Sequence, residues 1–137
     1  MEIKKVVVIG SGTMGSGIAA HLCNANIPVT LLDLKTEISE KARKRIYSSR
    51  PPLLLDKTKI NNINVGNIND DFNVIKDADW IVEAVVEKID IKHNLYEKIF
   101  KNRKVGSVVS SNTSSIPIKV LSENLSKQDK KDFCITH

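Results

Sequence analysis

Short apolar runs rich in β-branched residues alternate with amphipathic stretches along the whole chain of 137 residues. The run "VVVI" ends at Gly10 and has the length and composition of a buried strand. Beyond this glycine, Ile18, Leu22 and Ala25 recur at helical spacing. The same pattern predicts strands over 4–9, 27–33, 61–66, 79–86, 106–112 and 132–136, and helices over 14–25, 37–47, 89–102 and 116–126.

Strands that alternate with helices favour a parallel sheet, because each crossover between parallel strands needs a covering helix. We therefore predict an α/β fold: a doubly wound, mainly parallel sheet in three layers, α/β/α. The length suits one domain, and no internal repeat, low-complexity tract or linker divides the chain. Residues 1–137 are expected to form that single domain.

Positive charge is concentrated in one predicted helix, and the chain carries a formal net charge of +5. Five basic residues fall within "EKARKRIYSSR": Lys41, Arg43, Lys44, Arg45 and Arg50. A solvated helix face and an anion-binding face both fit this pattern. Nucleic acid fits it less well, because only one aromatic residue interleaves with the charges and no reading-helix motif is present. No nucleic-acid partner is predicted.

The two cysteines, Cys23 and Cys134, stand far apart in apolar surroundings. They are typical of small core residues in a reducing compartment rather than of a disulfide framework. The apolar stretch "VVVIGSGTMGSGIAA" contains four glycines and is shorter than a membrane span, which argues against a signal peptide or an anchor. We expect a cytoplasmic protein with no membrane partner and no metal.

A glycine-rich turn carries the most specific chemistry. In "VVVIGSGTMGSG" the spacing G-x-G-x-x-G follows a predicted strand and opens a predicted helix. We assign a tight turn to Gly10, close approach to a diphosphate to Gly12, and helix-on-strand packing to Gly15, which Gly17 extends. The start of the helix adds free N–H groups and partial positive charge. The predicted cofactor-binding stretch is Gly10, Ser11, Gly12, Thr13, Met14 and Gly15.

An acidic residue strengthens this assignment. Asp33 ends the second predicted strand, 23 positions after Gly10, where about 20 are expected for a carboxylate that binds the adenine ribose. A carboxylate there favours NAD over NADP, although Lys35 lies nearby. The fold is thus of Rossmann type. A ligand-free glycine turn and a methyltransferase turn share this layout and stay open, whereas a phosphate-loop NTPase is excluded because no Gly-Lys-Ser/Thr follows.

Three further stretches carry a family resemblance: "DWIVEAVVEKIDIKHNLYEKI", "SSNTSSIPI" and "DFCITH", in this order. With the glycine turn they resemble the NAD-binding domain of 3-hydroxyacyl-CoA dehydrogenases, including the bacterial fatty-acid-oxidation and 3-hydroxybutyryl-CoA enzymes. The resemblance is least close over 48–75, where the helical hairpin that contacts CoA in many members looks short. No CoA-contacting residue is therefore assigned.

The resemblance implies roles for individual residues. Glu87 and Lys92 match family residues that contact the cofactor, whereas on sequence alone each reads as a solvated polar residue beside the sheet. Ser114 matches a serine between nicotinamide and substrate, although "SSNTSS" also reads as a helix-entry turn with capping hydroxyls. His137 matches the catalytic base. His21 and His93 have no match and are expected to be structural or solvated.

The resemblance also implies parts that residues 1–137 do not contain. In the family a downstream glutamate orients the histidine, an asparagine helps to hold the substrate, and a helical C-terminal domain closes the cleft and forms the dimer. We therefore expect a domain incomplete at its C-terminal end, with an uncovered apolar strip around Phe133 and Ile135. It would bind NAD weakly and catalyse little unless a separately encoded C-terminal domain completes it for a 3-hydroxyacyl-CoA or 3-oxoacyl-CoA substrate. A stand-alone NAD-binding or sensing module is the alternative.

Overall fold

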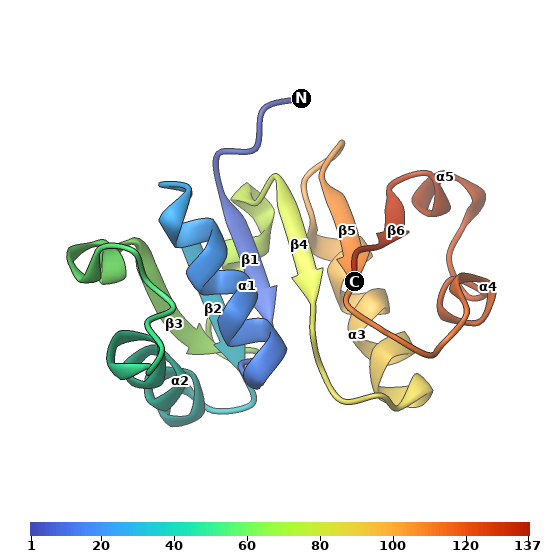
Figure 1. The fold of residues 1–137 in the computed structure, drawn as a ribbon. Coiled ribbons are helices and arrows are strands. Elements are labelled where there is room, and N and C mark those ends of the chain that lie inside the picture. The colour runs from blue at the N-terminus through green and yellow to red at the C-terminus, as the bar shows by residue number, and fades with distance from the viewer.

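A six-stranded sheet organises the chain. The computed structural model describes residues 1–137, and all six strands run parallel in the order β3-β2-β1-β4-β5-β6 (Figure 1). The strands are β1 (Val6–Ile9), β2 (Val29–Asp33), β3 (Ile63–Asn67), β4 (Trp80–Glu83), β5 (Val108–Ser111) and β6 (Phe133–Ile135). The predicted doubly wound parallel sheet is confirmed, and no helical C-terminal domain is present in these residues.

Helices cover both faces of this sheet. The first face carries α1 (Thr13–Asn24), α2 (Thr36–Ser48) and the 3₁₀ helix η1 (Lys57–Asn62). The second face carries α3 (Ile89–Asn102), the 3₁₀ helix η2 (Phe72–Asp77) and the short α4 (Ile118–Leu121), and α5 (Lys127–Lys130) leads into β6. In Figure 1, α1 and α2 lie in front of β1, β2 and β3, and α3 lies behind β4 and β5.

Strand β1 shows why its sequence is continuously apolar. Val6 and Val8 enter the core under α1 and α2, whereas Val7 and Ile9 enter the core under α3. All four side chains are buried, because a central parallel strand has no solvent face. Amphipathic helices then cover the two cores, and their crossovers bring the end of every strand to one edge of the sheet.

The structure corrects several expectations outside the site. Phe133 is buried in the chain's own core, with its ring centroid 5.1 Å from that of Tyr96, so the predicted uncovered strip around Phe133 is wrong. The helix α1 leaves open space beside Gly17, which therefore does not extend the packing.

Both cysteines are free, and Cys23 is buried, as expected. No helix has the length and apolar composition that a membrane crossing requires.

Candidate cofactor and active site

Most of the predicted site residues lie at or just after strand ends on one edge of the sheet, whereas Lys92 lies in α3. The strand register aligns the last residues of four neighbouring strands: Ile9, Glu83, Ser111 and Ile135. Four predicted residues follow these ends directly or within a few positions, namely Gly10, Glu87, Ser114 and His137, and Asp33 is the last residue of β2, which pairs with β1. The strand order reverses between β1 and β4, and open α/β sheets bind ligands at such a switch point.

The three glycines of the turn have different surroundings. Gly10 has φ +105°, and a Cβ there would overlap the carbonyl oxygen of Ala84. A Cβ at Gly15 would overlap the carbonyl oxygen of Gly10. By contrast, no protein atom lies within 4 Å of a Cβ at Gly12. The turn therefore needs glycine at two positions for its own packing, and at the third it leaves room for something outside the chain.

The helix after the turn starts without a polar cap. Gly12 is the N-cap residue of α1, no side chain accepts from its first N–H groups, and no acidic residue lies in its first turn. Thr13 and Met14 are exposed at this helix start, whereas Ser11 is buried. Uncapped N–H groups and the positive end of the helix dipole fit an anionic diphosphate. This donor set, together with the space at Gly12, fits NAD.

Asp33 is fixed against the glycine turn. Its Oδ2 accepts hydrogen bonds from the backbone N–H of Ser11 (2.8 Å) and from the Ser11 hydroxyl (2.5 Å). Its Oδ1 accepts from the backbone N–H of Leu34 (2.7 Å). The side chain stays partly exposed. The carboxylate thus lies beside the turn, as a ribose-binding acid must.

A basic residue also reaches the turn. Arg45 in α2 donates from Nη2 to the carbonyl oxygen of Ser11 (3.1 Å). Another residue of the same charged run, Arg43, donates to the backbone carbonyls of Ile60 and Ile63. Neither arginine is simply a solvated charge, and the charge run alone could not single out these two.

A cavity of about 540 Å³ lies beside the glycine turn, and its lining includes Gly10, Asp33 and Arg45. This volume is within the size range of small-molecule sites.

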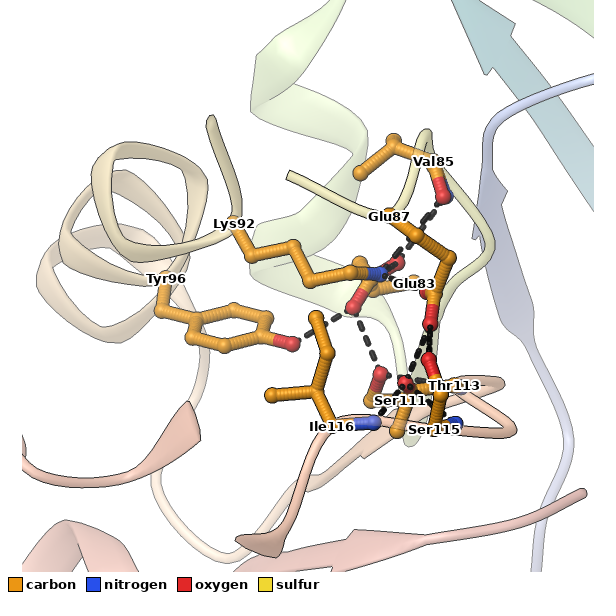
Figure 2. A network of polar contacts seen from close by, with 9 residues as sticks. All are labelled: Glu83, Val85, Glu87, Lys92, Tyr96, Ser111, Thr113, Ser115 and Ile116. Carbon is orange, nitrogen blue, oxygen red and sulfur yellow. Dashed lines mark hydrogen bonds and ion pairs between the residues drawn. The ribbon is translucent and has the colours of Figure 1, made fainter. Parts of the chain in front are cut away.

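Lys92 lies in a buried ion-pair network (Figure 2). Its Nζ is 2.6 Å from Glu83 Oε2 and 3.0 Å from Glu87 Oε1, and its side chain is 1% exposed. The reading of Lys92 as a solvated residue is therefore wrong. Glu87 keeps 41% of its side chain exposed, so one member of the network faces the open edge of the sheet.

Glu83 is the centre of this network and was not predicted. It is fully buried at the end of β4. Its Oε1 accepts hydrogen bonds from the Tyr96 hydroxyl (2.5 Å) and the Ser111 hydroxyl (2.7 Å), and its Oε2 also accepts from the Val85 N–H (2.9 Å). An acid inside the apolar run "DWIVEAVV" was the available signal, because charged residues are rarely buried unless they are paired.

Glu87 holds the loop that carries Ser114. Its Oε2 accepts from the hydroxyls of Thr113 (2.6 Å) and Ser115 (3.0 Å). Desolvation alone would raise the pKa of the Glu87 carboxyl, but the hydrogen bonds from Thr113, Lys92 and Ser115 together lower it. Ser114 lies between the two anchored residues and is itself exposed. The Thr113 hydroxyl also accepts from the Ile116 N–H (3.1 Å) and so closes a turn within the loop. The helix α4 starts beyond this turn, with Pro117 as its N-cap and no side-chain cap, so the predicted capping hydroxyls are wrong.

His137 follows β6 and is exposed. The preceding residue is anchored, since the Thr136 N–H donates to the Ser111 carbonyl (2.9 Å). A cavity of about 690 Å³ adjoins the histidine, and its lining includes Met14, His21, Trp80, Asn112 and His137. No hydrogen bond joins His137 to Ser114, and the two follow the neighbouring strands β6 and β5.

The remaining histidines differ from each other. His21 is exposed and lines the same cavity as His137. His93 in α3 contacts the Val120 carbonyl oxygen through Nε2 (2.8 Å), and Asn124 lies 3.2 Å from its Nδ1. His93 is thus structural, as expected. No group of three or more histidine, cysteine or acidic side chains could hold a metal ion.

The strand order, the glycine turn at the first strand–helix junction and the acid ending β2 define a dinucleotide-binding domain. Comparison with known proteins narrows this class. The family described as "3-hydroxyacyl-CoA dehydrogenase, NAD binding domain" matches residues 5–137. The chain therefore belongs to the 3-hydroxyacyl-CoA dehydrogenase family, and NAD is its cofactor.

Individual relatives agree with this membership. The chain is 44% identical, over 99% of its length, to a putative fatty acid oxidation complex trifunctional enzyme of Rickettsia felis, of which it covers 20%. It is 40% identical over its full length to a probable 3-hydroxyacyl-CoA dehydrogenase of Deinococcus radiodurans, of which it covers 42%. The solved (S)-3-hydroxybutyryl-CoA dehydrogenase of Ralstonia eutropha superposes with a TM-score of 0.86 at 27% identity, over 99% of this chain and 49% of that one. The chain thus spans less than half of each of these relatives.

Proposed function

We propose that this chain is the coenzyme-binding part of an NAD-dependent 3-hydroxyacyl-CoA dehydrogenase that acts in fatty-acid oxidation or 3-hydroxybutyryl-CoA metabolism. The observation that carries the proposal is the common edge of the sheet. The register places the glycine turn, the Ser114 loop and His137 after strands that end side by side. A coenzyme bound across the switch point would thus have Ser114 and His137 near the half that lies on the β4 side.

Residues of the chain account for holding the coenzyme. The start of α1 holds the diphosphate, and Asp33 accepts hydrogen bonds from the ribose hydroxyls, where a 2′-phosphate would be repelled. Glu87 and Lys92 contribute on the β4 side, through the exposed part of Glu87. NAD supplies the hydride acceptor for oxidation of the substrate at C3.

His137 takes the proton of the 3-hydroxyl group during that oxidation. Imidazole suits this role because its ordinary pKa lies near neutrality, and a well-placed general base contributes about 10²–10⁴ in rate. Ser114 lies on the adjacent loop and orients the substrate oxygen. No hydrogen bond orients the His137 ring within these residues, so the isolated chain is expected to bind NADH and to turn over little.

The experiment follows binding and turnover separately. NADH binding is measured by calorimetry on the chain of residues 1–137, and NADH absorbance is followed with acetoacetyl-CoA, with and without a C-terminal domain of the family added as a separate protein. We expect binding in both cases and turnover only with the added domain. His137→Gln should abolish that turnover and leave NADH affinity unchanged. The matched control is His93→Gln, which changes a histidine bound to α4 and should retain turnover.

The outcomes separate the two hypotheses. Loss of turnover in both histidine variants, or in neither, contradicts the assignment of His137. Tight NADH binding with no turnover under any condition favours the stand-alone sensing module. Absence of NADH binding on folded protein contradicts both.

A further inference from the structure

Two buried polar side chains lie behind the cofactor edge of the sheet. Glu83 and Tyr96 are 0% and 1% exposed, so neither can reach a coenzyme. Yet both belong to the hydrogen-bond network that ends at the exposed Glu87 (Figure 2). A buried carboxylate is costly unless it is paired and hydrogen-bonded, and Glu83 has both an ion pair with Lys92 and hydrogen bonds from Tyr96 and Ser111.

The contacts form one continuous path. The Tyr96 hydroxyl donates to Glu83 (2.5 Å), Glu83 pairs with Lys92 (2.6 Å), and Lys92 pairs with Glu87 (3.0 Å). Glu87 in turn binds the hydroxyls on both sides of Ser114, at 2.6 and 3.0 Å. A second, shorter path runs directly from Glu83 to Ser111, the last residue of β5. The Ser114 loop is thus tied to Glu83 directly at Ser111 and indirectly, through Lys92 and Glu87, at Thr113 and Ser115.

The ammonium of Lys92 is held in place by the buried carboxylate of Glu83. It has three N–H donors: two meet the carboxylates of Glu83 and Glu87, and a third contact reaches the Val85 carbonyl at 3.5 Å. With one anion buried on its inner side, the ammonium cannot turn outward without leaving Glu83 unpaired. The position of Glu87 therefore depends on a carboxylate that lies behind it.

We propose that Glu83 and Tyr96 are positioning residues for the nicotinamide half of the coenzyme, acting through Lys92 and Glu87 to fix the loop that carries Ser114. The inference rests on the proposed NAD site and adds to it two residues without coenzyme contact. The network lies on the β4–β5 side of the switch point, whereas Asp33 and the glycine turn lie on the β1–β2 side. Its effect should therefore be confined to one half of the dinucleotide.

Tyr96→Phe is the sharpest perturbation. It removes a single oxygen and keeps the ring that packs edge-on against Phe133. Burial, with the nearby Glu83 carboxylate, raises the pKa of Tyr96, so the phenol stays a donor throughout the accessible pH range. Calorimetry with two probes, NADH and ADP, separates the halves of the site because ADP lacks the nicotinamide. We expect NADH affinity to fall about three- to tenfold and ADP affinity to stay within about twofold.

Two further variants test the path itself. In a Glu87→Gln background, Tyr96→Phe should cause a smaller loss of NADH affinity than it causes alone, because contributions along one network are not additive; the path through Ser111 accounts for what remains. Glu97→Gln, which changes an exposed acid on the same helix that pairs only with Lys101, is the matched control and should bind both probes normally.

Several outcomes would overturn the inference: equal losses for NADH and ADP, no loss for either, or full additivity with Glu87→Gln. The unmodified chain supplies the test of the underlying site. If it binds neither NADH nor ADP, the proposed NAD site fails. If it binds both and Tyr96→Phe changes nothing, only the positioning role fails.

Discussion

Alanine at Gly12 should separate coenzyme binding from folding. No protein atom lies within 4 Å of the added Cβ, and the backbone there has φ −69° and ψ −166°, which alanine adopts without strain. Losing glycine at an N-cap costs about 0.5–1 kcal/mol. Reduced freedom of the unfolded chain returns about 0.4–1 kcal/mol. The free energy of unfolding should thus change by less than about 1 kcal/mol.

The coenzyme meets a different situation. The methyl group enters the space beside the helix start where the diphosphate has to approach the backbone. Holding the diphosphate back from these N–H groups should cost more than about 1.4 kcal/mol, which is a factor of ten in affinity. We therefore expect Gly12→Ala to weaken NADH binding at least tenfold by calorimetry while urea unfolding stays near that of the unmodified chain.

Two other glycines of the same segment serve as controls. Gly17→Ala also enters open space, but in the helix interior, so it should stabilise the fold by up to about 1 kcal/mol and leave NADH affinity unchanged. Gly15→Ala would overlap the Gly10 carbonyl and should destabilise the fold by about 3 kcal/mol or more. Unchanged NADH affinity in folded Gly12→Ala would refute the placement of the diphosphate.

Three further predictions concern charge. Asp33→Ala should weaken NADH binding about tenfold, since it removes a hydrogen bond to a charged group, and calorimetry showing equal affinity would move the ribose elsewhere. Lys92→Met should lower the free energy of unfolding in urea by about 3–5 kcal/mol, because it leaves the buried Glu83 carboxylate without its cation. Adding Glu83→Gln should recover most of that loss. If it recovers none, the broken ion pair is not the cause of the lost stability. Hydrogen bonds from Lys104 and from two backbone N–H groups lower the pKa of Asp79 from 3.8 to about 2, so its stabilisation is present above about pH 4 and is lost between pH 4 and pH 2. In an acid unfolding experiment, Asp79→Asn should therefore lack the loss of stability between pH 4 and pH 2. An acid transition identical to that of the unmodified chain would contradict the hydrogen bonds assigned to Asp79.

The sequence predicted the strands well and their ends less well. The run 79–86 reads as one strand because apolar residues stand on both sides of Glu83, but β4 stops at Glu83. The next residues leave the sheet, and the Ala84 carbonyl packs against Gly10, a tertiary contact that no local pattern encodes. The short elements η1, η2 and α5 were missed for a similar reason, since one or two turns have too little periodicity to detect.

The candidate site likewise contains residues that a sequence rule links and residues that no sequence pattern links. Gly10 and Asp33 are linked by a spacing rule that reflects one strand–helix–strand unit, so the sequence was enough. Glu83 and Lys92 are nine positions apart across a strand end, a loop and a helix start, and no periodicity relates such positions. Phe133 was expected to be uncovered because its cover was assigned to a C-terminal domain. Its actual partner is Tyr96 on α3, and no local pattern links two residues so far apart in the sequence.

Lys92 is the only lysine among the buried residues. Reagents that acylate amines should modify the other lysines in the folded protein and spare this one. The slow modification of Lys92, followed by mass spectrometry, would then measure how often the structure around Lys92 opens to water. A bound coenzyme that stabilises this region should slow the modification. The amine of Lys92 can thus report coenzyme binding without any spectroscopic probe.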